Sequence, residues 1–316
     1  MTQLNFTTGH DGLIAVDKLG NRVLFLDPES LDVILTLEGF APRVHELSIS
    51  PDRRFAFVPI YGDGRHGDNP HPGHLVAKFD LVSRRHMGDF STAPYLAPHS
   101  IRWRTATELY CIGENSGILL GLDPLSGETT RAIPVGSNKA HRFEFTPDGA
   151  KAYTENEEDP FCSVIDMRSG ERLPNIETPN GTAGIAISPD GSTVVLTDAR
   201  EPNLIVIDAA TDSVRQTIPL EGLTQPAQIA RFSPDGRYLV VTSHEEPLGV
   251  IFDASLARQR RVHLGRGPMD LCYAPDGRTA LIANHDEGSL CVVDLERGET
   301  VRTVQAGVGV EVLSFY

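Results

Sequence analysis

Three histidines recur at one position of a repeated sequence pattern. In each predicted repeat a tight turn follows the first strand. His45, His99 and His141 lie six residues before the first residue of that turn in their repeats. The same position in the other four repeats holds Ala183, Gln228, Met269 and, from the end of the chain, Glu311. Three neutral imidazoles and one carboxylate suit a divalent transition metal such as zinc, iron or manganese, whereas calcium and magnesium prefer oxygen ligands alone. The sequence therefore predicts one such ion, bound by His45, His99, His141 and Glu311.

The repeats themselves are marked by an aspartate after a short apolar run. It recurs at intervals of 41 to 45 residues after a first interval of 53, at Asp27, Asp80, Asp123, Asp166, Asp208, Asp253 and Asp294. A Pro-Asp-Gly turn keeps the same period at residues 147–149, 189–191, 234–236 and 275–277. A period in the low forties with short apolar strands is typical of a four-stranded propeller blade. Seven copies predict an all-β fold, a seven-bladed β-propeller of four-stranded blades that forms a single domain over residues 1–316.

One repeat shows the pattern in full. Ser188-Pro-Asp-Gly191 is followed by the strand Val194-Val-Leu-Thr197, by Val206-Ile-Asp208 and by Ile218-Pro-Leu220. This order resembles the YVTN family of seven-bladed propellers, and the resemblance covers essentially the whole chain. The family tetrapeptide itself survives only loosely, as Leu281-Ile-Ala-Asn284. Related propellers include lactonases, lyases and surface proteins, so the resemblance implies the fold and, within enzymes, a lactonase-like activity.

The two ends of the chain carry complementary parts of one repeat. Residues 13–16, Leu-Ile-Ala-Val, read as the second strand of the first blade, and residues 312–316, Val-Leu-Ser-Phe-Tyr, read as a first strand that lacks its own blade. We therefore expect the C-terminal strand to complete blade one. Such closure leaves no exposed sheet edge and makes the ring one cooperative unit.

The long first interval comes from an insertion in blade two. Residues 61–74 form a loop about ten residues longer than its counterparts, and it contains His66, His71 and His74. The loop joins the second and third strands, so we expect it to cover the channel mouth as a lid. The alternative is a surface insertion without a function, because loops tolerate added length at low cost.

Other residues near the histidine position predict how a substrate is held. Three cations lie within two residues of it, and Gln228 occupies it in the opposite sector; the predicted substrate-binding residues are Arg43, Lys139, Arg142 and Gln228. Basic side chains suit a small anionic molecule. The cations have an alternative role as partners of Glu46, Glu144 or Glu155. Candidates for general acid and base are Asp270, His285 and His244, since a histidine titrates near neutral pH.

Charge and composition restrict the partners. The formal net charge of -15 disfavours nucleic acid, because phosphate backbones are repelled and the sequence has no basic stripe. No apolar run reaches eighteen residues, and Met1 to Phe6 has no charged and then apolar character, so we expect a cytoplasmic protein without a membrane segment. Four cysteines without metal-binding spacing are expected to be buried, reduced thiols. The remaining partner class is a small-molecule substrate.

These features support three functional hypotheses. The first is a metal-dependent hydrolase or lyase, lactonase-like, in which the ion acts as a Lewis acid or activates water. The second is an oxygenase, because three histidines and a glutamate also suit redox-active iron, manganese or copper. The third is a propeller that binds partners without catalysis, in which the histidines only fill the channel mouth. Metal content separates the first two hypotheses from the third.

Overall fold

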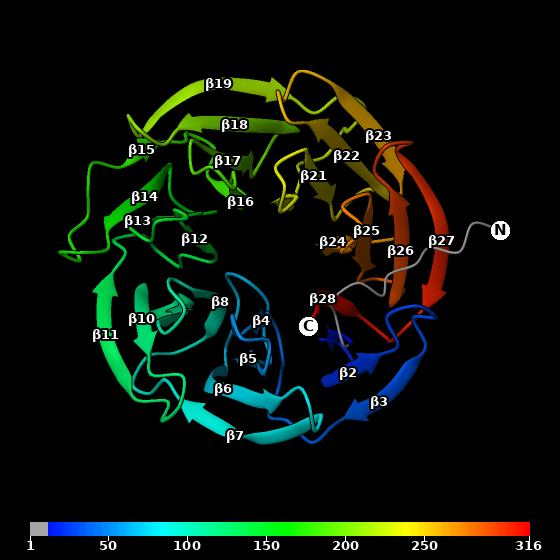
Figure 1. The fold of residues 1–316 in the computed structure, drawn as a ribbon. Helices are drawn as coiled ribbons and strands as arrows, with labels where there is room; N and C mark the ends of the chain where they lie inside the picture. Colours follow the sequence, from blue (N-terminus) through cyan, green and yellow to red (C-terminus); the bar gives the residue numbers. More distant parts are fainter. Residues whose placement is uncertain (1–11) are drawn as a thin grey trace.

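The chain folds as a ring of seven antiparallel sheets around a central axis (Figure 1). The structure, a computed structural model, describes residues 12–316. Each sheet has four strands, and the only helical turn within the described residues is a short 3-10 turn, η1 (Glu114–Ser116). The predicted seven-bladed β-propeller is therefore confirmed. The segment Met1 to Phe6, on which the prediction about a leader rests, lies outside the described residues.

Blades two to seven follow one another along the chain, each beginning with its innermost strand, whereas blade one takes its innermost strand from the end of the chain. Blade one contains β28 (Val310–Phe315), β1 (Leu13–Asp17), β2 (Arg22–Leu26) and β3 (Val33–Leu37). Blade two contains β4 (Ser48–Ile49), β5 (Phe55–Gly62), β6 (Pro72–Asp80) and β7 (Arg85–Ser91). Blade three contains β8 (Pro98–Trp103), β9 (Leu109–Gly113), β10 (Ile118–Leu122) and β11 (Thr129–Pro134). Blade four contains β12 (Phe143–Phe145), β13 (Lys151–Thr154), β14 (Phe161–Asp166) and β15 (Ile176–Glu177).

The last three blades have the most regular strands. Blade five contains β16 (Thr182–Ile187), β17 (Thr193–Asp198), β18 (Asn203–Asp208) and β19 (Ser213–Pro219). Blade six contains β20 (Ile229–Phe232), β21 (Tyr238–Ser243), β22 (Leu248–Asp253) and β23 (Gln259–His263). Blade seven contains β24 (Pro268–Tyr273), β25 (Thr279–Asn284), β26 (Ser289–Asp294) and β27 (Glu299–Gln305).

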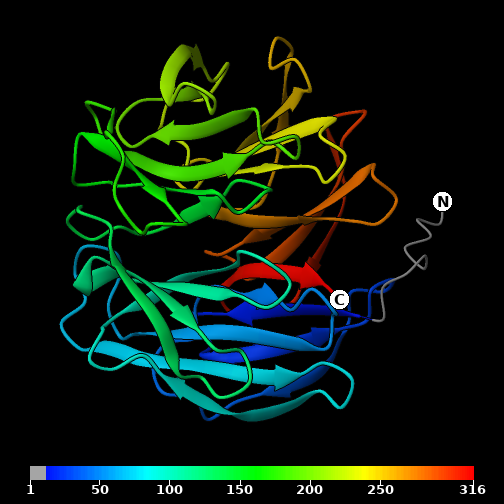
Figure 2. The ribbon, with the colours of Figure 1, turned by 60° about the vertical axis from the view of Figure 1, so that its left-hand side comes forward.

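The ring is closed by the C-terminal strand, as expected from the sequence. β28 pairs with β1 in a register that places Leu13 opposite Phe315, and the red C-terminal strand lies beside the blue first blade in Figure 2. The backbone of Gly12 exchanges two hydrogen bonds with that of Tyr316, of 3.3 and 3.0 Å. A Cβ atom on Gly12 would lie 2.4 Å from the tyrosine ring, so glycine is required for this close approach.

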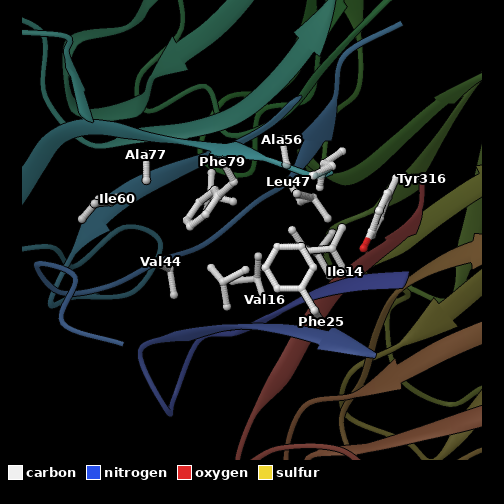
Figure 3. Close-up of a cluster of buried hydrophobic side chains, with 14 residues drawn as sticks. Ile14, Val16, Phe25, Val44, Leu47, Ala56, Ile60, Ala77, Phe79 and Tyr316 are labelled. Carbon is white, nitrogen blue, oxygen red and sulfur yellow. The ribbon is translucent and has the colours of Figure 1, made fainter. Parts of the chain in front are cut away.

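The core consists of apolar side chains packed between neighbouring blades. Between blades one and two, Ile14 and Phe25 meet Ala56 and Phe79, with Tyr316 at the edge of the same cluster (Figure 3). The rings of Phe25 and Tyr316 meet edge to face, 6.1 Å apart. Apolar residues of the inner strands thus pack on both faces of the blades, whereas outer strands such as β7 and β19 are mostly exposed. Tyr316 belongs to this core.

The repeated aspartates act as turn acceptors rather than as catalytic groups. Oδ1 of Asp27 accepts the backbone N–H of Ser30 at 2.7 Å, and Asp123 accepts that of Ser126 at the same distance. These bonds lower the pKa of both aspartates, because they stabilise the ionised carboxylate. The repeated aspartates therefore indicate the propeller fold and not a catalytic site.

The architecture brings distant parts of the chain together at the channel mouth. The inner strands β4, β8, β12 and β28 come from four consecutive blades and surround one sector of the axis (Figure 1). Residues at the starts of these strands, and in the loops that join second and third strands, meet on the same side of the ring. All four cysteines are free; Cys111, Cys162 and Cys291 are buried as expected, whereas Cys272 is only partly buried. Within residues 12–316 no helix is long and apolar enough to span a membrane, and the cytoplasmic location stays a prediction.

Deleting residues 310–316 should abolish cooperative folding rather than remove a loose tail. The deletion removes β28, exposes the edge of β1 and takes Tyr316 from the core between blades one and two. Thermal unfolding followed by circular dichroism should show no native transition. A control substitution at Leu125, which is 77% exposed, should melt like the wild type, and a truncated chain that does so too would refute the closure.

Candidate metal centre

His45, His99 and His141 converge at the channel mouth from three neighbouring blades. His99 lies in β8, while the other two residues shortly precede the inner strands of blades two and four. The ring centroids of His45 and His99 are 4.1 Å apart, and those of His99 and His141 are 3.9 Å apart. One nitrogen from each ring lies within 4.8 Å of the other two. These three side chains, called the histidine triad below, are all buried.

The central member of the triad, His99, is suited to an ion because its nitrogens lack other partners. Both ring nitrogens of His99 are buried without a hydrogen bond. Burial lowers the pKa of His99 and of His141 well below the usual value, and neighbouring positive groups lower it further. Both imidazoles are therefore neutral at neutral pH, the form that binds metals. An unsatisfied buried imidazole costs free energy, which a bound cation would offset.

Each histidine of the triad has a carboxylate facing its Nδ1 atom. Oε2 of Glu311 lies 3.0 Å from Nδ1 of His45, and Oε1 of Glu155 lies 2.9 Å from Nδ1 of His141. Oε1 of Glu46 lies farther, at 4.0 Å, from Nδ1 of His99. In metal sites a ligating histidine commonly has a carboxylate or carbonyl at its second nitrogen, which fixes the orientation of the ring. The same arrangement leaves Nε2 of His99 and His141 available to an ion, whereas Nε2 of His45 also contacts Nζ of Lys18 at 3.3 Å.

Lys18 stands beside the triad and was missed in the sequence. Its Nζ lies 3.3 Å from Nε2 of His45 and 3.2 Å from both carboxylate oxygens of Glu311. Glu311 is therefore paired with Lys18 and His45, and it lies outside the group of atoms formed by the triad. Lys18 directly follows β1, in the loop that joins the second and third strands of blade one. Inspection of that loop, as of its equivalents in other blades, could have found it.

A buried network of ion pairs holds the triad in position. Nε of Arg142 donates to Glu46 at 3.1 Å, and Nη1 of Arg142 contacts Nδ1 of His141 at 3.3 Å and the carbonyl oxygen of Ala183 at 3.1 Å. Burial alone would raise the pKa of Glu46, but Arg142 and then Arg102 outweigh it and lower this pKa to about 2. Arg142 is thus fully used in holding Glu46 and His141 in position.

The insertion of blade two reaches the site, as the predicted lid should. The ring of His66 lies 4.1 Å from that of His141, centroid to centroid. Its Nδ1 is 3.2 Å from Oε2 of Glu114, and its Nε2 is 3.1 Å from Oε1 of Glu158. Burial would lower the pKa of His66, but these carboxylates outweigh it and raise the pKa to about 11. Without a bound ion, His66 therefore carries a positive charge beside the triad, and a metal ion bound by this imidazole would displace its proton.

The other two histidines of the insertion point elsewhere. His71 is 80% exposed at its side chain and pairs with Asp63 at 2.8 Å, while His74 lies exposed in β6. The loop is held in place by Lys139, whose Nζ donates to the carbonyl oxygen of Gly67 at 2.7 Å. The insertion is thus attached to blade four and contributes one imidazole to the site.

The predicted substrate-binding residues are mostly occupied by the protein itself. Arg142 binds Glu46, in accord with the alternative role considered for the cations, and Lys139 holds the lid. Gln228 donates to Glu157 at 3.3 Å. The backbone of Arg43 exchanges hydrogen bonds with that of the lid boundary, at Tyr61 and Gly62. Their role in substrate binding stays a prediction, and Lys18 and Arg142 each approach a triad nitrogen at 3.3 Å.

The predicted acid and base residues lie in two separate places. Both oxygens of Asp270 are bound by Arg231, at 3.0 and 2.7 Å, so this carboxylate has a structural partner. His285 contacts Asp286 at 3.0 Å, and His244 contacts the same oxygen at 3.4 Å. His244, His285 and Asp286 form a partly exposed group, and their potential ligand atoms lie within 4.8 Å of one another. The structure brings His244 and His285 together, and Asp270 belongs to a different ion pair.

The fold is shared with two solved enzyme structures. The sequence matches no protein-family model and no curated protein. Periplasmic gluconolactonase PpgL of Pseudomonas aeruginosa superposes with a TM-score of 0.77 at 20% identity, over 96% of this chain and 98% of that one. Hydrazine synthase of Kuenenia stuttgartiensis superposes with a TM-score of 0.70 at 18% identity, over 86% of this chain and 89% of that one. The chain is a seven-bladed propeller. At these identities the likeness shows the fold, and the chemistry must come from the site.

Asp270→Ala should destabilise the protein strongly. The substitution leaves the largely buried Arg231 without its bidentate partner, and breaking such a pair costs about 3–5 kcal/mol. Urea unfolding of this variant, compared with the conservative Asp270→Asn, measures the effect. A loss of stability below about 1 kcal/mol would show that Arg231 does not depend on Asp270, and the carboxylate would then be free to act as a base.

Proposed function

We propose that the protein is a metal-dependent enzyme of the hydrolase or lyase type that acts on a small organic molecule at the channel mouth. The observation that carries this proposal is the histidine triad, and above all His99, whose two ring nitrogens are buried without a partner. The triad would hold one zinc, iron or manganese ion. Such an ion polarises a carbonyl group or lowers the pKa of a bound water molecule.

The protein's own residues supply orientation and charge around that ion. Glu311, Glu155 and Glu46 orient the three imidazoles, so Glu311 supports His45 rather than acting as the fourth ligand. The fourth coordination position is then left to water or substrate, as in catalytic metal sites. At the positions equivalent to the triad, blades five and seven carry the buried neutral residues Ala183 and Met269. These two side chains carry no charge that would compete with the substrate for the ion.

Lys18 supports a substrate with a carboxylate or a developing oxyanion. Its ammonium group is 14% exposed at the side chain and lies next to His45, so it can donate to an oxygen of a molecule bound at the ion. Hydrolysis of a lactone fits this arrangement, since attack of water on the carbonyl carbon places negative charge on the carbonyl oxygen. Ring opening then breaks the bond to the ring oxygen, which leaves as an alkoxide and takes up a proton. The fold shared with a gluconolactonase makes glucono-lactone a suitable first substrate to test.

His99→Ala should abolish most metal retention. The loss of a ligand weakens binding more than the loss of an orienting residue, which typically costs about 10 to 100-fold in affinity. Elemental analysis of protein purified without a metal-binding tag measures the ion; zinc as the main element favours hydrolytic chemistry, whereas copper favours redox chemistry. Added metal should raise the melting temperature of the wild type and not that of His99→Ala.

The control for this experiment is His263→Ala, which removes an exposed histidine from the outer strand β23. It should retain metal like the wild type. A wild-type protein that binds no transition metal and shows no thermal shift would refute the metalloenzyme proposal and favour a propeller that binds partners without catalysis.

Replacing the lid should reduce turnover without unfolding the ring. β6 begins at Pro72, so a short Gly-Ser linker in place of residues 64–71 leaves the strands of blade two intact. The replacement removes His66 and opens the site to water, which should lower lactone hydrolysis by at least about 10-fold. Activity is measured by acid release, and thermal unfolding checks the fold. Full activity in this variant would mean that the insertion has no catalytic role.

A further inference from the structure

A second group of ligand atoms adjoins the histidine triad on the side of the lid. His66, Glu114 and His141 offer one atom each within 4.8 Å of one another, and so do His141, Glu155 and Glu157. Both groups contain His141, which is also a member of the triad. The lid, the loop after β9 and the loop after β13 therefore surround a space next to the proposed metal position.

Buried atoms around this space lack hydrogen-bond partners. Nδ1 of His66 and Oε2 of Glu114 lie 3.2 Å apart without the geometry of a hydrogen bond, and neither has another partner. Two ligands that are each about 2.1 Å from one zinc ion are separated by about 3–3.5 Å. The observed spacing is therefore that of two ligands of a common ion. Both carboxylate oxygens of Glu155 are also buried and unpartnered.

The charge around the space favours a cation. Four carboxylates from Glu114, Glu155, Glu157 and Glu158 gather within reach of His66 and His141. The arginine closest to them, Arg142, is 3.7 Å from Glu155 and is engaged by Glu46. Glu114 and Glu155 are buried, whereas Glu157 is partly buried and Glu158 is exposed. Burial, together with the charge of Glu157, raises the pKa of Glu155 well above its usual range, and a divalent ion would offset this cost by stabilising the ionised carboxylate.

We propose that this space is a second site for a divalent transition metal, with His66, Glu114 and His141 as ligands and with Glu155 and Glu157 as neutralising neighbours. The inference rests on the proposed function, because His141 belongs to both groups of ligand atoms. To hold both ions, His141 would lose its N–H proton and bridge them as an imidazolate, with Nδ1 facing the second ion in place of its contact with Glu155. A two-metal centre stabilises both the attacking and the leaving oxygen of a substrate. The lid then has a defined role, because its closure delivers a ligand and completes the second site.

The number of bound zinc ions tests this inference. Equilibrium dialysis of the full chain against zinc, followed by elemental analysis, should give two ions per wild-type chain and one for Glu114→Gln. The glutamine is a poor metal ligand, yet its amide oxygen can still accept the hydrogen bond that the Tyr61 hydroxyl gives to Glu114 at 2.8 Å. Glu171→Gln, an exposed substitution between β14 and β15 of blade four, is the matched control and should bind two ions.

Each outcome has a separate meaning. One ion in the wild type, lost in His99→Ala and kept in Glu114→Gln, would overturn the second site and leave the proposed function intact. Two ions in Glu114→Gln would overturn the ligand assignment, whereas no ion in the wild type would overturn both proposals. If Glu114→Gln fails to fold, the variant with residues 64–71 replaced by Gly-Ser, which lacks His66, gives the same test and should bind one ion.

Discussion

The burial of three imidazoles, with the central ring of His99 about 4 Å from each of the other two, is the constraint on which this site depends. Neutral rings with unpartnered nitrogens are unfavourable in the interior of a protein, and protonation would add repulsion between them. The surrounding carboxylates fix the rings, and the arginines beneath fix one of those carboxylates in turn. A bound cation would offset the remaining free-energy cost, because it accepts the lone pairs of the unpartnered nitrogens and adds no proton.

The propeller provides what this constraint requires, because each blade presents one residue at the start of its inner strand. Neighbouring blades bring these residues to the same depth, so one imidazole per blade produces a cluster without any local motif in the sequence. The cluster is held by the closed ring, whose last strand pairs with the first strand of the described chain. Stability of the fold and geometry of the site are therefore linked through the same inner strands.

Repetition made the fold and the triad predictable from sequence. The aspartate and Pro-Asp-Gly markers gave the blade register, and the register placed His45, His99 and His141 at equivalent positions. The partners of those residues were not predictable in this way, since contacts such as Glu46 with Arg142 and Lys18 with Glu311 join residues 96 and 293 positions apart. Asp270 illustrates the same limit: its position near the mouth was evident, but its ion pair with Arg231 depends on how blades six and seven pack. His66 was placed in the lid, but only the three-dimensional path of the loop shows that its ring meets His141.

X-ray absorption spectroscopy of the zinc-loaded protein tests the central claim most directly. The account predicts a first shell that includes imidazole nitrogens at about 2.0–2.1 Å, with the outer-shell scattering of histidine rings. The His99→Ala protein should lose that imidazole signal. A shell made of oxygen atoms alone, unchanged by the substitution, would show that zinc binds surface carboxylates and that the buried histidines do not form a metal centre.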